Sequence, residues 1–217
     1  MESILSFFIE PYQQASILDI ALEIIAVILG VASVIYAVRE NILVYPTGII
    51  STGIFIYLLY KYTLFGDMIV NCYYTVMSIY GWVQWSKSKI TIEKDKPLEN
   101  EIEVSWTNKR DRIISSLIFL STVAFVIVVY LMNDRFDRWT DYVDTFTTGI
   151  FFTAMWLMAN KKIESWHFWI IANIISIPLY FYKGLGFTGL QYIIFLVLAF
   201  NGLKAWKQSY NKRIIVA

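Results

Sequence analysis

The sequence alternates between apolar stretches, each about twenty residues long, and short segments that hold most of the charged side chains. A helix of about twenty apolar residues is long enough to cross the hydrocarbon core of a bilayer. Only 16% of the residues are charged and 58% are hydrophobic, which leaves too few charges to cover a water-exposed surface. We therefore predict an all-α integral membrane protein with seven transmembrane helices, over residues 18–38, 43–62, 67–85, 113–132, 143–160, 165–183 and 187–206.

The basic residues are distributed unevenly over the connections between these helices. If the N-terminus lies outside, 14 of the 18 lysines and arginines fall in inside segments, and the other four are Lys61, Arg135, Arg138 and Lys183. Cytoplasmic segments of membrane proteins carry an excess of Lys and Arg. We expect the N-terminus outside, the C-terminus inside, and therefore a cytoplasmic loop over 86–112 and a cytoplasmic tail over 207–217.

The sequence of residues 60–85 is partly repeated in residues 182–206. Each contains a Tyr-Lys pair and ends with a Gly followed four residues later by a Trp. One predicted helix separates the two copies, so both have the same orientation, and such parallel repeats form two bundles with a substrate path between them. We expect a single transmembrane domain over 1–206, with a first three-helix bundle (18–85), a linker helix (113–132) and a second three-helix bundle (143–206).

Polar and aromatic side chains recur every three or four residues in three of the predicted helices, which places them on one face of each helix. Amide, hydroxyl and aromatic groups together suit a small, flat, polar organic molecule. The alternatives are helix–helix hydrogen bonds for Asn and Ser and interfacial anchoring for Trp and Tyr near helix ends. The candidate substrate-binding residues are Asn71, Tyr74, Ser78, Thr148, Trp156, Trp166, Trp169, Asn173, Ser176 and Tyr180.

Several classes of protein are disfavoured. The sequence has no phosphate-binding loop, no metal-ligand spacing and no nucleophile–base motif, so we expect no enzyme activity, no cofactor and no metal. A net charge of +1 argues against a nucleic-acid partner. Glu23 lies deep in the first predicted helix, where pairing with another helix is expected and proton coupling is the alternative.

The motifs resemble those of the PnuC family of vitamin transporters over residues 20–207. The resemblance is carried by Asn71-x-x-Tyr74-x-x-Met77-Ser78-x-Tyr80-Gly81-Trp82-x-x-Trp85 in the first half, and by Trp166-x-x-Trp169, Asn173-x-x-Ser176 and Tyr180-Phe181-Tyr182-Lys183-Gly184 in the second.

This resemblance implies a seven-helix transporter similar in plan to the SWEET sugar transporters, in the bacterial inner membrane. It implies facilitated diffusion of nicotinamide riboside, made one-way by a cytoplasmic vitamin kinase, and a homotrimer. Related branches carry thiamine or riboflavin, and a membrane-embedded ligand sensor is a third possibility. Nicotinamide riboside members tend to have Gln at the position of Asn71, Ser near Phe151 and Gln near Met155, so the cargo contacts of this chain differ from theirs.

Overall fold

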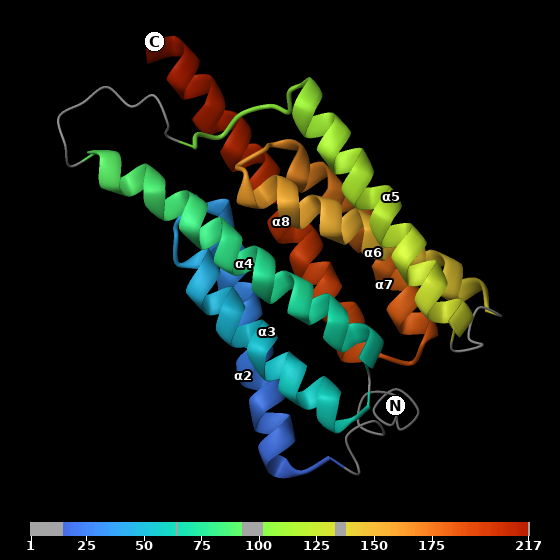
Figure 1. The fold of residues 1–217 in the computed structure, drawn as a ribbon. Helices are drawn as coiled ribbons and strands as arrows, with labels where there is room; N and C mark the ends of the chain where they lie inside the picture. Colours follow the sequence, from blue (N-terminus) through green and yellow to red (C-terminus); the bar gives the residue numbers. More distant parts are fainter. Residues whose placement is uncertain (1–14, 64, 93–101, 133–137, 217) are drawn as a thin grey trace.

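A computed structural model of the chain describes residues 15–63, 65–92, 102–132 and 138–216. Within these ranges the chain is helical apart from turns and one isolated bridge between Ser105 and Lys162. The helices, in chain order (Figure 1), are α2 (Ile17–Val38), α3 (Val44–Lys61), α4 (Phe65–Ile92), α5 (Lys109–Met132), α6 (Trp139–Ala159), α7 (Glu164–Tyr182) and α8 (Gly186–Val216).

Each range predicted to be a transmembrane helix overlaps one of these helices. The largest differences are at the ends of α4 and α8, which continue to Ile92 and Val216 through charged sequence. Lys, Gln and Arg are good helix formers, so the end of an apolar stretch does not end the helix. Three of the described helices, α2, α5 and α8, are apolar and long enough to cross a membrane by these properties alone. The prediction of an all-α membrane fold is confirmed at this level.

The helices pack in two consecutive groups. α2, α3 and α4 contact one another in chain order, as do α6, α7 and α8, and the groups meet where α2 contacts α8 and α4 contacts α6. α5 packs along α6 at one side of the molecule (Figure 1), with only Ser115 and Thr122 buried. The interior that can hold a site therefore lies between the two groups.

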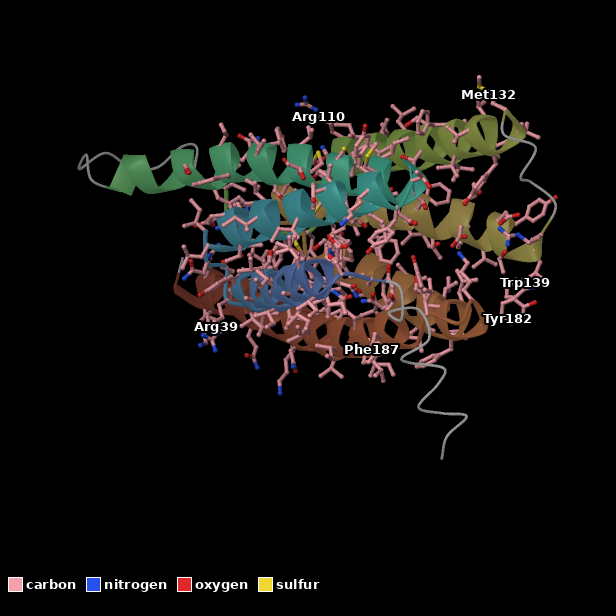
Figure 2. The ribbon with its side chains drawn as sticks, turned by 90° about the horizontal axis from the view of Figure 1, so that it is seen from below. Arg39, Arg110, Met132, Trp139, Tyr182 and Phe187 are labelled. Carbon is pink, nitrogen blue, oxygen red and sulfur yellow. The ribbon has the colours of Figure 1, made fainter. Side chains whose placement is uncertain are left out.

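Different segments of the chain lie at the two ends of the molecule. Met132, Trp139 and Tyr182 lie at one end, called here the far end, and Arg39 lies at the opposite end (Figure 2). That opposite end also carries residues 102–108, a non-helical segment that leads into α5 and is called here the strap. We refer to it as the strap end.

The strap end holds the larger hydrophobic core. Its buried residues come from both helix groups and from the strap, and they are Ala37, Val44, Tyr45, Trp85, Val104, Met158, Ile163, Trp166, Ile170, Ala199 and Trp206. We refer to this set as the strap-end core.

Two indoles join the helix groups in the strap-end core. Trp85 Nε1 of α4 donates a 3.0 Å hydrogen bond to the carbonyl of Ala159 at the end of α6. Trp206 Nε1 of α8 donates a 3.0 Å hydrogen bond to the carbonyl of Ala37 near the end of α2. Both acceptors are carbonyls in the last turn of a helix, and the Ala37 carbonyl also accepts a 3.1 Å hydrogen bond from the Glu40 N–H.

The turns after α2 and α6 have the same geometry. Glu40 and Lys161 both adopt positive φ, 54° and 51°. Beyond them, Asn41 N–H bonds to the Tyr36 carbonyl and Lys162 N–H to the Leu157 carbonyl, both at 2.9 Å. These are the bonds of Schellman C-caps, in which a left-handed residue ends the helix.

In each helix group, a glycine of the last helix lets an aromatic ring pack directly against that helix. A Cβ atom at Gly81 would overlap the Tyr45 ring, and one at Gly202 would overlap the Trp166 ring. Residue pairs 40/161, 45/166, 81/202 and 85/206 all have the same separation, so equivalent local structures recur at a constant spacing.

We predict that Gly202→Ala destabilises the protein while Gly53→Ala does not. Overpacking a filled core costs about 1–3 kcal/mol, whereas Gly53 has no atom within 4 Å of its added Cβ. At such an open helical site, Ala in place of Gly stabilises by about 0.4–1 kcal/mol. Thermal unfolding of the purified variants in one detergent measures both effects. A Gly202→Ala protein that unfolds at or above the wild-type temperature would contradict this packing.

Candidate ligand-binding site

Seven aromatic side chains meet where α4, α6, α7 and α8 come together. We refer to them as the aromatic cluster, and they are Tyr73, Tyr74, Phe151, Phe152, Trp169, Tyr180 and Tyr192.

The α4 side of the cluster is fixed to α6 by Tyr73. Its ring stacks on Phe152 with centroids 3.7 Å apart, and its hydroxyl donates a 2.9 Å hydrogen bond to the Phe152 carbonyl. The neighbouring Tyr74 turns toward α7 and lies 6.3 Å from the Trp169 ring. Helix α4 of the first group thereby contributes one wall of a site whose other walls belong to the second group.

The remaining walls come from α6, α7 and α8. Phe151 contacts Trp169 at 5.5 Å and Tyr192 at 5.9 Å between ring centroids. Tyr192 in turn stacks on Tyr180 at 4.9 Å, so the rings form a continuous path from the middle of α7 to its far end. Rings in such offset and tilted contacts present faces on which a planar molecule can stack.

Three polar atoms on one face of α7 are buried without a hydrogen-bond partner in the part of the chain that the structure describes. They are Trp169 Nε1, Asn173 Oδ1 and Ser176 Oγ, spaced four and three residues apart. Asn173 and Ser176 are each only 1% exposed. A buried polar group without a partner costs about 1–3 kcal/mol, so native structures keep such groups mainly where water or a ligand completes them. The face offers a ring N–H donor, an amide oxygen acceptor and a hydroxyl.

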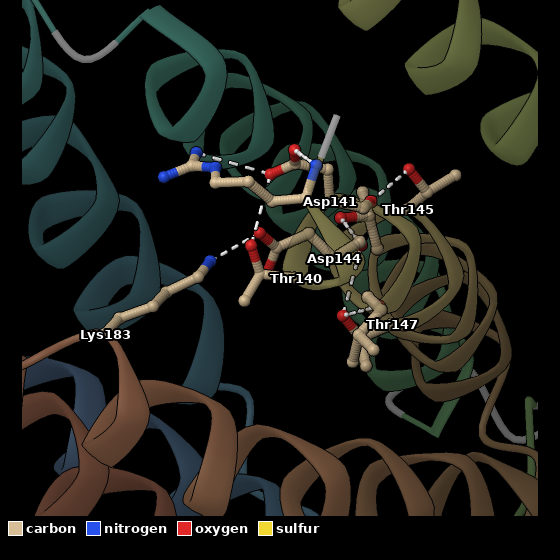
Figure 3. Close-up of polar contacts among 9 residues, drawn as sticks. Thr140, Asp141, Asp144, Thr145, Thr147 and Lys183 are labelled. Carbon is tan, nitrogen blue, oxygen red and sulfur yellow. Dashed lines mark hydrogen bonds and ion pairs between the residues drawn. The ribbon is translucent and has the colours of Figure 1, made fainter. Parts of the chain in front are cut away.

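A charged group lies at the far end of the aromatic cluster. Lys183, which caps α7, forms an ion pair with Asp144 of α6 (Figure 3), and its Nζ lies 5.5 Å from the centre of the Tyr180 ring. Asp67 of α4 is near enough to Asp144 and Lys183 to interact with both charges. With Asp141 and Arg138, which also act on Asp144, this end of the cluster holds three carboxylates and two cations and carries a net negative charge.

Five of the sequence-predicted residues lie outside the aromatic cluster or use their polar groups locally. Asn71 Nδ2 donates to the Asp67 carbonyl one turn earlier, at 2.9 Å. Thr148 Oγ1 donates to the Asp144 carbonyl in the same way, at 2.7 Å. Their partners and surroundings are those expected of packing residues.

Ser78 is buried beside Gly48 of α3, within the first helix group. Trp166 is in the strap-end core against Gly202 and Trp206, seven residues before Asn173. Trp156 is half-buried on α6, one turn nearer the strap end than Phe152. Tyr74, Trp169, Asn173, Ser176 and Tyr180 are the predicted residues that the structure brings to the cluster or to the unpaired face of α7.

Sequence analysis missed Tyr73, Phe151, Phe152 and Tyr192 as site residues. Phe151 is apolar and Tyr192 is in a mostly apolar helix, so neither is marked by a polar stripe, whereas Phe152 recurs at helical spacing with Thr148 and Trp156. A signal for Tyr192 was available, because the constant spacing of the repeated structures places it at the position equivalent to Asn71.

A surface hollow of about 260 Å³ lies elsewhere, beside the strap. It is lined by polar residues of the strap, of α5 and of the α6–α7 turn, among them Glu103, Asp111 and Lys162. We place the candidate site at the aromatic cluster instead, because the rings and the unpaired buried atoms converge there.

Apolar helices long enough to cross a membrane are the features of a multi-pass membrane protein, and the rings and buried polar atoms between them form a candidate site for a small polar molecule. The family described as nicotinamide mononucleotide transporter matches residues 20–208, and the chain belongs to this family. The sequence-based assignment to a family of PnuC-like vitamin transporters is confirmed.

Named relatives cover most of the chain. It is 25% identical to the nicotinamide riboside transporter PnuC of Escherichia coli, with 88% of this chain and 87% of the relative covered. It is 24% identical to the riboflavin/roseoflavin transporter RibM of Streptomyces davaonensis, with 82% and 81% covered. The crystal structure of the vitamin B3 transporter PnuC has the same fold, with a TM-score of 0.66, 21% identity, and 88% and 82% of the two chains covered.

We predict opposite stability effects for the same substitution at two buried serines. Ser51 Oγ donates a 2.7 Å hydrogen bond to the Ala26 carbonyl, so Ser51→Ala should cost about 1 kcal/mol. Ser176 Oγ has no partner, so Ser176→Ala should leave the unfolding temperature unchanged or raise it. Thermal unfolding without added ligand measures both. Equal destabilisation by the two variants would show that Ser176 is a packing residue with a satisfied hydroxyl.

Proposed function

We propose that the protein transports nicotinamide riboside across the bacterial inner membrane. The nicotinamide riboside transporter of Escherichia coli supplies the cargo hypothesis, and the unpaired face of α7 beside the aromatic cluster is the observation that carries it. The rings stack on a planar base, while the amide oxygen, hydroxyl and indole N–H of this face satisfy its carboxamide and ribose groups. Of the residues predicted from the sequence, we propose Tyr74, Trp169, Asn173, Ser176 and Tyr180 as binding residues, and we add Phe151 and Tyr192.

Charge favours this cargo over riboflavin. The pyridinium ring of nicotinamide riboside carries a positive charge, whereas the ring system of riboflavin is neutral. Aromatic faces attract cations, and the end of the aromatic cluster beside Asp67, Asp144 and Lys183 has a net negative charge. Thiamine also carries a positive charge and stays as an alternative cargo, as does riboflavin on the strength of the RibM relative.

We also propose that the seven helices each cross the membrane, with the N-terminus outside and the strap end in the cytoplasm. The excess of basic residues in the segments at the strap end supports this orientation. The matching turns, glycine contacts and indoles at constant spacing support two parallel three-helix repeats joined by α5, a plan like that of the SWEET transporters.

Transport by this plan is facilitated diffusion, in which the two helix groups open alternately to each side. A facilitator stops at equal concentrations, so net uptake requires a cytoplasmic step that consumes the cargo. We propose phosphorylation by a vitamin kinase as that step. The exposed apolar side of α5, with Leu117, Leu120 and Val128, is a surface through which a homotrimer can form.

Counterflow in liposomes tests the function. We expect purified protein to exchange labelled nicotinamide riboside, with slower exchange of thiamine and riboflavin and no effect of a proton uncoupler. Counterflow of none of the three would contradict transport, and binding without counterflow would identify a ligand sensor. Uptake abolished by the uncoupler would instead indicate proton-coupled transport, for which Glu23 is the first residue to substitute.

We predict that Trp169→Phe lowers nicotinamide riboside uptake about tenfold, because it removes the indole N–H and part of the ring that packs against Tyr74 and Phe151. Trp139→Phe is the matched control, since Trp139 is 53% exposed at the far end and contacts Tyr182 rather than the site. Wild-type uptake by Trp169→Phe would remove this indole from the binding site. Initial uptake rates in liposomes give the comparison.

A further inference from the structure

The strap is held against the turn between α6 and α7 by its backbone. Ser105 N–H donates to the Lys161 carbonyl at 3.1 Å, and Ile163 N–H donates to the Ser105 carbonyl at 3.0 Å. These two bonds form the bridge between Ser105 and Lys162. The strap is therefore fixed to the second helix group although it follows the first in the sequence.

Side chains add further links on both sides of this bridge. Glu164 of α7 accepts hydrogen bonds from the Thr107 backbone N–H and from the Thr107 hydroxyl. Lys162 Nζ lies 3.0 Å from an Asp111 carboxylate oxygen of α5, with both side chains mostly buried. On the other side, Arg213 of α8 lies between Glu103 of the strap and Glu40 of the α2–α3 turn. The strap thus connects both helix groups at one end.

Val104 is the residue that the strap inserts into the protein. It is 2% exposed and belongs to the strap-end core, whose other members come from α2, α3, α4, α6, α7 and α8. Trp169 packs against both this core and the residues around Phe151 in the aromatic cluster. Val104 therefore lies beyond the aromatic cluster, between the candidate site and the strap end.

Polar atoms without partners lie in the strap-end core and at Ser165, which is next to the core residue Trp166 in the sequence. Tyr45 Oη, Ser165 Oγ and Trp166 Nε1 are buried and form no hydrogen bond within the described residues. Closing the strap over them keeps water away from groups that water would satisfy. Opening the strap end would let water form hydrogen bonds with these atoms. The free energy lost with the apolar contacts on opening is therefore partly offset.

We propose that the strap, residues 102–108, is the cytoplasmic gate of the transport path, with Val104 as its plug. The inference rests on the transport function and orientation proposed above. In this structure the gate is closed: the strap is bonded to Lys161 and Ile163, and the indoles of Trp85 and Trp206 hold the two helix groups together. Release of cargo into the cytoplasm requires the strap to leave the α6–α7 turn and both indole bonds to break.

A disulfide across the bridge tests whether the strap must move. Ser105→Cys and Lys162→Cys, in a Cys72→Ala background, place thiols at bridged positions, where backbone spacing suits a disulfide. We expect oxidation to lower nicotinamide riboside uptake about tenfold or more and reduction to restore it. Ser105→Cys alone, with the same oxidant, is the control. Equal uptake in the oxidised and reduced forms would overturn the gate, whereas wild-type protein that takes up no cargo would overturn the transport function instead.

A labelling experiment tests the plug without any transport. Ser165→Cys in the Cys72→Ala background places a thiol next to the strap-end core, where the serine hydroxyl has no partner to lose. We expect Val104→Ala to raise the rate of maleimide labelling at this thiol about tenfold, because opening is favoured when the plug is truncated. Val128→Ala, at an exposed position of α5, should leave the rate unchanged. Unchanged labelling in the Val104→Ala protein would contradict its role as the plug.

Discussion

The arrangement of the two helix groups depends on the hydrogen bonds from Trp85 and Trp206 to the opposite group. Each indole donates to a carbonyl near a helix C-terminus of the opposite group, Ala159 for Trp85 and Ala37 for Trp206. A buried indole N–H without a partner is costly, so these bonds favour the observed placement of the groups. They also explain the glycines four residues earlier, since Gly81 and Gly202 admit the Tyr45 and Trp166 rings beside each indole.

Some polar groups in this protein form hydrogen bonds or ion pairs between helices. Others have no partner among the described residues and are candidates for binding a ligand. Ser51 bonds to the Ala26 carbonyl, and Lys61 pairs with Asp19 at 2.7 Å, so α2 and α3 are tied by satisfied groups. Ser176 is as deeply buried as Ser51, and its hydroxyl has no partner among the described residues. For these two serines, residue type and burial are alike, so the difference lies in whether the hydroxyl is satisfied.

Much of the fold was predictable from the sequence because apolar length and helical period are local signals. The polar face of α7 was predicted for the same reason, as Trp169, Asn173 and Ser176 recur at helical spacing. The same period also selected Trp166, which the structure places in the strap-end core, because period fixes a face of the helix and says nothing of depth. The insertion of Val104 has no periodic signal, since it is one residue of a loop.

The two helix groups share their backbone arrangement and differ in the side chains packed inside it. By the constant spacing of the repeated structures, Gly48 of α3 is at the position equivalent to Trp169 of α7. At Gly48 the helix lies close to Ser33 and Ser78 of its own group, and at Trp169 an indole reaches toward Tyr74 and Phe151. The first group is closely packed at the level where the second presents rings and unpaired atoms. A ligand at this level is therefore held mainly by the second group, and Tyr74 is the contact through which the first group responds to it.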